Sequence, residues 1–185
     1  LDDLLFFLPE IHPVRKSHYY ADSLLPMLQA LGEADCATVA TPKLGEELTG
    51  FNKNIIILPN YFDDSIWRLR DPNSKPEEDS PLIIGYMGSE SHQPDVAYIA
   101  PVLDKLLKHY PTEILIHFWG VKPPRELAGY SQVKWIPAQT YEYVDFAHYF
   151  QTQNADIFIA PLIDNPFNRA KSPLKFLEYT ALGAP

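Results

Sequence analysis

The chain of 185 residues has little of what several common site types need. Cys36 is its single cysteine, so no internal disulfide and no cysteine-rich zinc site can form, and we interpret it as a small buried residue. The six histidines show no metal-ligand spacing, and no G-x-S-x-G elbow is present. These gaps argue against a metal enzyme and against a hydrolase with a nucleophilic serine or cysteine.

Positive charge and long apolar runs are also scarce. The 15 basic residues against 24 acidic ones give a formal charge of −9, which argues against a general nucleic-acid binder. No apolar run approaches the roughly 18–20 residues that a membrane span needs. Together with the single cysteine, this predicts a cytoplasmic protein. Its attachment to the inner face of a membrane through regions outside this sequence is left open.

What is present is typical of a globular α/β protein, with 46% hydrophobic and 21% charged residues. Apolar runs that end at Pro, Gly or Asn alternate with stretches of helical periodicity. The predicted strands are 37–42, 54–60, 82–87, 113–120, 133–138 and 157–159, and the predicted helices are 18–34, 42–48, 94–109, 141–153 and 174–182.

A charged, proline-rich stretch at 68–81 has no apolar periodicity and predicts a linker between two domains. The first domain is then 1–67 and the second 82–185. Because the chain starts without methionine and stops straight after a helix, we expect a fragment of a longer protein, incomplete at both ends.

The last thirty-one residues combine a strand, a polar loop and a helix. Ser172 is the expected N-cap of that helix and Pro173 its first residue. Backbone N–H groups at a helix start attract anions, and Lys171 adds a cation just before it. Lys175 and Glu178 lie three residues apart, so an ion pair worth about 0.2–0.5 kcal/mol is the structural alternative to a binding role.

A second candidate turn follows the predicted strand at 82–87. Gly88 and Ser89 form a sharp turn where the backbone can approach a ligand closely. With Gly85 as the only other glycine here, the turn is neither a dinucleotide fingerprint nor a P-loop. The alternative is a plain turn in which Ser89 or Asp95 caps the next helix.

The stretches LPNYFDDSIW and PLIDNPFNRAKSPLKFLEYTALGAP resemble glycosyltransferases of the GT-B fold, closest to family 4, a retaining group that uses nucleotide-sugars. The resemblance implies a Rossmann-like parallel sheet with flanking helices. It also implies that 1–67 ends an acceptor-side domain and that 82–185 binds the sugar donor. The family usually has a glutamate at the position of Ala170, and this departure bears on direct sugar contacts.

By motif position, Glu178 would hold the ribose, and Lys171 would be the catalytic residue that stabilises charge on the leaving diphosphate. The resemblance implies a donor-binding set of Gly88, Ser89, His92, Asn168, Lys171, Ser172, Lys175 and Glu178. Weaker candidates are Ile136 and Pro137 near the base, and the Asp2–Asp3 pair, which the alternative treats as turn or cap carboxylates.

The predicted reaction is transfer of a hexose-type sugar, with retention, from a nucleoside-diphosphate sugar to a glycan, lipid or protein acceptor, as in polysaccharide biosynthesis. No metal and no other cofactor is expected. The alternatives are a non-catalytic nucleotide- or carbohydrate-binding module and a scaffold that keeps the fold for protein contacts.

Overall fold

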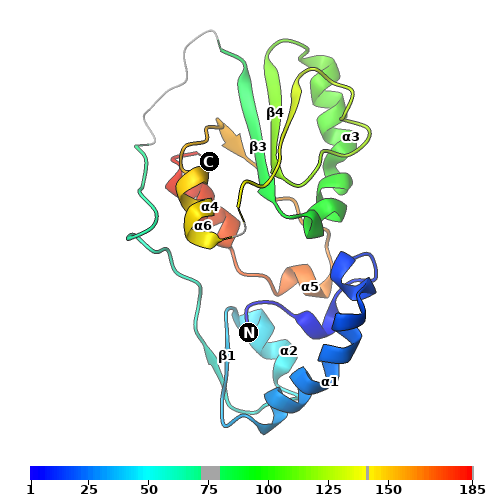
Figure 1. Ribbon diagram of the computed structural model, residues 1–185, viewed down its shortest axis with the longest axis vertical. Coiled ribbons are helices and arrows are strands. Elements are labelled where there is room, and N and C mark those ends of the chain that lie inside the picture. The colour runs from blue at the N-terminus through cyan, green and yellow to red at the C-terminus, as the bar shows by residue number, and fades with distance from the viewer. Residues whose placement is uncertain (72–79, 141, 185) are drawn as a thin grey trace. The chain divides into compact units, whose positions relative to one another are not determined.

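A computed structural model describes residues 1–71, 80–140 and 142–184, so residues 72–79 of the predicted linker lie outside the described residues. The chain divides into two compact units, and each is described by itself (Figure 1). Unit 1 comprises Leu1–Tyr61 and Ile163–Leu174, and unit 2 comprises Phe62–Leu162 and Lys175–Pro185.

Unit 2 is built on a four-stranded sheet in which every neighbouring pair is parallel. Its strands are β3 (Leu82–Gly88), β4 (Ile114–Gly120), β5 (Val133–Ile136) and β6 (Ile157–Phe158). They lie in the order β5-β4-β3-β6, so the first and fourth strands of the unit are neighbours. This is the order of a Rossmann half-sheet, in which the chain reverses its direction of winding between these two strands.

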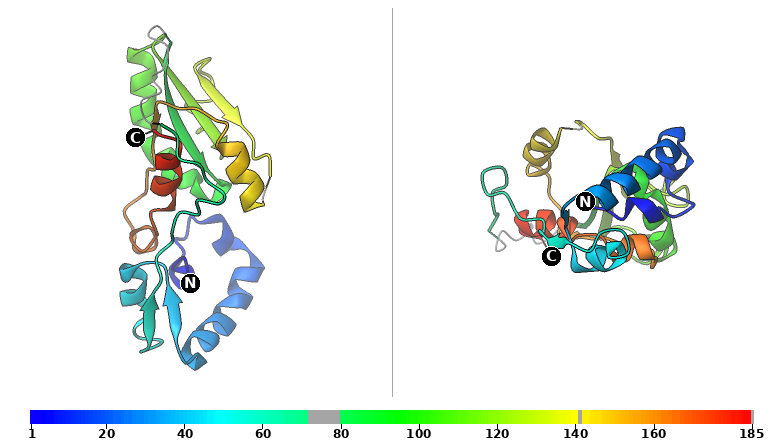
Figure 2. Two further views of the ribbon diagram at one scale, coloured as in Figure 1. Left: turned by 90° about the vertical axis from the view of Figure 1, so that its left-hand side faces the viewer. Right: turned by 90° about the horizontal axis from the view of Figure 1, so that it is seen from below.

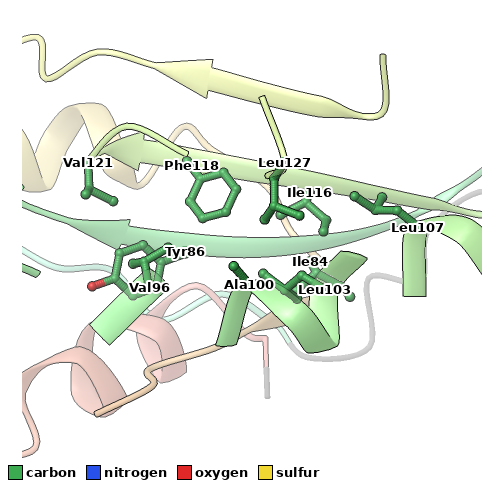
Figure 3. Packing of buried hydrophobic residues seen from close by; sticks show 10 residues of the cluster. All are labelled: Ile84, Tyr86, Val96, Ala100, Leu103, Leu107, Ile116, Phe118, Val121 and Leu127. Atoms are coloured by element: carbon green, nitrogen blue, oxygen red, sulfur yellow. The ribbon is translucent and has the colours of Figure 1, made fainter. Parts of the chain in front are cut away.

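Apolar side chains cover both faces of this sheet, because alternate residues of a strand point to opposite sides. Ile84 and Tyr86 of β3 pack with α3 (Gln93–His109) on one face (Figure 3). Met87 of β3 packs on the other face, which α4 (Tyr143–Phe150) and α6 (Leu174–Ala181) cover (Figure 1). The predicted α/β fold with a Rossmann-like parallel sheet and flanking helices is therefore confirmed.

The segment directly before the predicted linker packs on unit 2. Trp67 is only 2% exposed within an apolar cluster that includes Met87 and Phe150. Its Nε1–H donates to the Tyr143 hydroxyl over 3.0 Å. Unit 2 begins at Phe62, so this segment belongs to it.

Unit 1 contains a two-stranded parallel sheet of β1 (Ala37–Val39) and β2 (Ile55–Ile57), joined through α2 (Pro42–Leu48). Figure 2 shows α2 beside the two strands. Helix α1 (His18–Glu33) precedes β1, and two short 3-10 helices lie at η1 (Leu5–Phe7) and η2 (Pro13–Lys16). Every element predicted from 18 to 60 is present, with shorter strands.

The predicted polar loop before the last helix contains a short helix, α5 (Pro166–Arg169), whose N-cap Asn165 accepts from the Asn168 N–H. Phe167 and Ala170 belong to the apolar core of unit 1, together with Leu4. This burial joins 163–174 to unit 1.

Gly85 lies where β3 packs tightly against the segment that contains β6. A Cβ built on Gly85 would lie 2.6 Å from the Phe158 ring and 2.8 Å from the Ala155 Cβ. Overpacking of this kind typically costs 1–3 kcal/mol, so we expect Gly85→Ala to lower the free energy of unfolding by roughly that amount. Chemical denaturation measures it, with Gly129→Ala as control because its Cβ would meet nothing within 4 Å. Equal losses in both variants would contradict the prediction.

Candidate functional site

The carboxyl ends of β3 and β6 meet where the winding reverses, which is where open α/β sheets bind ligands. Here β3 ends at Gly88, whose carbonyl accepts from the Val121 N–H over 2.7 Å. Its neighbour Gly120 has a φ of +84°, and a Cβ there would lie 2.4 Å from the Gly88 oxygen. The two strand ends therefore approach each other in a way that only glycine allows at position 120.

After Gly88 the chain forms η3 (Glu90–His92) and enters α3. Asp95, in the first turn of α3, is 5% exposed, and its Oδ2 lies 3.1 Å from His92 Nδ1. A carboxylate only accepts hydrogen bonds, so this contact places the proton on Nδ1 and fixes the imidazole ring. The exposed Ser89 contacts Ser91 through its hydroxyl at 2.7 Å and makes no side-chain cap.

Helix α6 is fixed to the end of β3 by the hydroxyl of Tyr179. This oxygen accepts from the Met87 N–H over 3.2 Å and donates to the Met87 carbonyl over 3.3 Å. Strand β6 pairs only with Ile84 and Gly85, so the phenol binds backbone groups that lie beyond its end. The Tyr179 ring also stacks on Phe158, with centroids 4.5 Å apart.

Glu178, the neighbour of Tyr179 in the chain, is a buried acid. It is 8% exposed, and its carboxylate has no hydrogen bond or ion pair to any residue that the structure describes. Burial raises the pKa of Glu178 from 4.5 to about 7, against a smaller lowering by the charge of Lys175. Buried carboxylates are normally hydrogen-bonded, so this one is suited to a ligand that brings its own hydroxyl donors.

Lys175 lies one turn before Glu178 in the chain, with its ammonium group 5.7 Å from the centre of the Tyr86 ring. Gly88 is also next to Tyr86, because a Cβ on Gly88 would lie 2.8 Å from the Tyr86 hydroxyl. Unit 2 thus carries five of the predicted donor-binding residues. Two of them, Gly88 and Lys175, lie next to Tyr86 at the carboxyl end of β3. Neither Tyr86 nor Tyr179 was predicted as a site residue.

The other three predicted residues belong to unit 1. Asn168 is 8% exposed, and its side-chain amide donates to the Ile163 carbonyl over 2.9 Å, a contact that stabilises the turn around α5. The ammonium group of Lys171 lies 4.8 Å from the centre of the Phe167 ring.

Ser172 is not placed where an N-cap is needed, since α6 begins at Leu174. Its hydroxyl accepts from the side-chain amide of Asn60 over 2.8 Å, and the same amide donates to Asp2 over 2.6 Å. Ala170 is fully buried, and its carbonyl accepts from the Thr41 hydroxyl over 2.8 Å. Position 170 is therefore a core position of unit 1.

The weaker candidates near the base lie at the end of β5, where Ile136 is half-buried and Pro137 exposed. The described residues contain no group of three or more His, Cys, Asp or Glu placed to hold a metal ion. None of the helices in the described part of the chain is long and apolar enough to cross a bilayer.

No family model matches the sequence, and no curated relative matches it. The structure is similar to that of a trehalose-6-phosphate synthase studied for glycosyltransfer with retention, with a TM-score of 0.52 and 14% identity. The match covers 95% of this chain and 48% of that one, so the chain spans about half the length of its neighbour. The fold is GT-B-like.

A second similar structure is the Glycosylation Associate Protein (Gap123) complex from Streptococcus agalactiae, with a TM-score of 0.41 and 12% identity. That match covers 80% of this chain and 32% of the other. With a TM-score below 0.5, this second likeness is too weak to bear on the fold, and the first, at 14% identity, speaks for the fold alone. The GT-B fold predicted from the sequence is thus confirmed, and the resemblance to family 4 stays a prediction.

Proposed function

We propose that this chain binds the nucleotide-sugar of a glycosyltransferase, which transfers a hexose-type sugar with retention to a glycan, lipid or protein acceptor. The observation that carries the proposal is the carboxylate of Glu178. It is buried and lacks a hydrogen bond to any described residue, in a helix fixed to the strand end where Rossmann-like sheets bind nucleotides. Two ribose hydroxyls can supply the donors that a buried carboxylate needs.

The charges of unit 2 suit a diphosphate next to that ribose. Lys175 provides a cation, and the first turn of α3 adds the backbone N–H groups that follow Pro94, which itself has none. Negative charge grows on the leaving diphosphate as the bond to the sugar breaks. Fixed cations and backbone dipoles then stabilise the transition state more than the ground state. No metal ion is required for this role.

Titration of the protein with uridine, guanosine and adenosine diphosphates, followed by calorimetry, tests the proposal. We expect one of them to bind, and to bind more tightly than the nucleoside without phosphates. Glu178→Ala should abolish or strongly weaken that binding, whereas Glu126→Gln, at an exposed acid, should not change it. If none of the three diphosphates binds, the proposed function is overturned.

Lys171 is proposed to neutralise the diphosphate, as its motif position implies. We expect Lys171→Ala to raise the dissociation constant of the bound nucleoside diphosphate roughly tenfold, the effect of losing one charge-assisted contact. Lys122→Ala is the matched control, because Lys122 also lies over an aromatic ring, at 5.3 Å from Trp135. Unchanged affinity in a folded Lys171→Ala variant would remove Lys171 from the site.

The core position of Ala170 favours a second candidate, a binding module without catalysis. A glutamate at residue 170 would have to enter the apolar core of unit 1, where Ala170 is 0% exposed. The side chain that the family usually uses there is therefore missing for a packing reason. Diphosphate binding without sugar turnover favours the module, and absence of binding favours a scaffold.

A further inference from the structure

Tyr86 carries an unexplained polar atom. The residue is 0% exposed, and its fully enclosed hydroxyl has no hydrogen-bond partner in the described part of the chain. Buried polar groups nearly always have partners, since an unpaired one loses its hydrogen bonds to water without replacement. A phenylalanine would fill the same apolar space without that cost.

The position of this hydroxyl suggests what its partner is. In Figure 3 the Tyr86 oxygen points toward the carboxyl end of β3, away from the centre of the apolar cluster. It lies 2.8 Å from where a Cβ on Gly88 would be, so the absence of a side chain at Gly88 makes room for it. Lys175 lies over the ring at 5.7 Å, and α3 begins five residues after Gly88.

The chemistry of the surroundings selects an acceptor atom. Burial raises the pKa of Tyr86 far above its usual value, and the negative charge of Asp95 adds to this, so the hydroxyl keeps its proton and donates. The Lys175 ammonium group is a donor as well, and so are the backbone N–H groups that follow Pro94 in the first turn of α3. Several donors that converge on one strand end fit an anionic oxygen.

We propose that the Tyr86 hydroxyl donates a hydrogen bond to a phosphate oxygen of the nucleoside diphosphate, which makes Tyr86 a further ligand-binding residue. The inference rests on the proposed function and adds to it a residue that the sequence placed only within the predicted strand at 82–87. It also gives Gly88 a defined role, because a larger residue there would displace the hydroxyl.

Tyr86→Phe separates this role from a structural one, because the two predict opposite changes. A hydroxyl kept for a ligand contributes nothing to the unliganded protein, so the variant should unfold at the same or a higher denaturant concentration than the wild type. Its dissociation constant for the nucleoside diphosphate should rise about tenfold, as expected for one hydrogen bond to a charged group. Affinity for the nucleoside without phosphates should not change.

The controls make each outcome decisive. Tyr98→Phe, at a 66% exposed tyrosine of α3, should alter neither stability nor affinity. Gly88→Ala should weaken diphosphate binding in the same direction as Tyr86→Phe, which gives a second variant should the first fold poorly. Unchanged affinity in Tyr86→Phe, or lost stability with unchanged affinity, overturns this inference alone. A wild-type protein that binds none of the diphosphates overturns it together with the proposed function.

Discussion

Glu178→Gln is expected to stabilise the unliganded protein by about 3 kcal/mol at pH 8 while it weakens nucleotide binding. Burial raises the pKa of Glu178 from 4.5 to about 7, so ionising this acid in the folded protein is unfavourable. At about 1.4 kcal/mol for each pKa unit, the raised value corresponds to roughly 3 kcal/mol. Glutamine is neutral at every pH and avoids this cost.

The sign of the pH dependence follows from the same shift. Below pH 4.5 the acid is protonated in both the folded and the unfolded chain and costs nothing. Between pH 4.5 and about 7 the unfolded chain loses its proton first, so stability falls as the pH rises. Above pH 7 the loss is complete. We therefore expect the stability difference between Glu178→Gln and wild type to grow across this window.

Ligand binding should show the opposite trend. Ribose hydroxyls that donate to Glu178 favour its ionised form, so affinity for the nucleoside diphosphate should increase as the pH rises through 7 in the wild type. The variant should lose that dependence. Denaturation and calorimetry at pH 5, 6, 7 and 8 measure both effects, with Glu126→Gln as control. A variant that is less stable than wild type at pH 8 would show that the carboxylate has a structural partner.

Tyr179→Phe is expected to lower the free energy of unfolding by about 2–4 kcal/mol. The substitution removes one oxygen but leaves two backbone groups of Met87 without a partner, and each unsatisfied buried group costs about 1–3 kcal/mol. The ring and its stacking on Phe158 are retained. Chemical denaturation measures the loss, and the exposed Tyr98→Phe should stay within about 0.5 kcal/mol of wild type.

The same variant should also affect binding, because Tyr179 fixes the helix that carries Lys175 and Glu178. We expect weaker affinity for the nucleoside diphosphate at temperatures where the variant is still folded. The two tyrosine variants should therefore differ in their effect on stability. Tyr179→Phe should destabilise the unliganded protein, whereas Tyr86→Phe should not. If Tyr179→Phe is as stable as wild type, the hydroxyl does not fix α6 to β3.

The alternating pattern of the sequence predicted the sheet of unit 2 well. Each of its strands is an apolar run that ends at a breaker, and the helices between them make parallel pairing the natural arrangement. The same pattern could not predict that residues 163–174 pack into unit 1. Its local signal was present, since Asn165 before Pro166 is a typical helix start. The burial of Phe167 and Ala170 depends on partners more than a hundred residues away.

The candidate site was predicted from the resemblance more than from the pattern. Glu178 and Lys175 match motif positions, and the structure adds that Glu178 is buried without a described hydrogen-bond partner. Tyr86 and Tyr179 were missed because a tyrosine within an apolar run looks like an ordinary core residue. Only the structure shows that the Tyr179 hydroxyl binds the backbone of Met87 and that the Tyr86 hydroxyl has no partner among the described residues.

The assignment of residues 163–174 to unit 1 bears on how this protein can be dissected. A chain divided between residues 71 and 80 would not give two complete units. The amino-terminal piece would lack Phe167 and Ala170 and would expose the apolar surface that they cover. The carboxyl-terminal piece would carry residues 163–174, which pack in unit 1, between β6 and α6. Limited proteolysis followed by separation under native conditions should therefore recover the two pieces together.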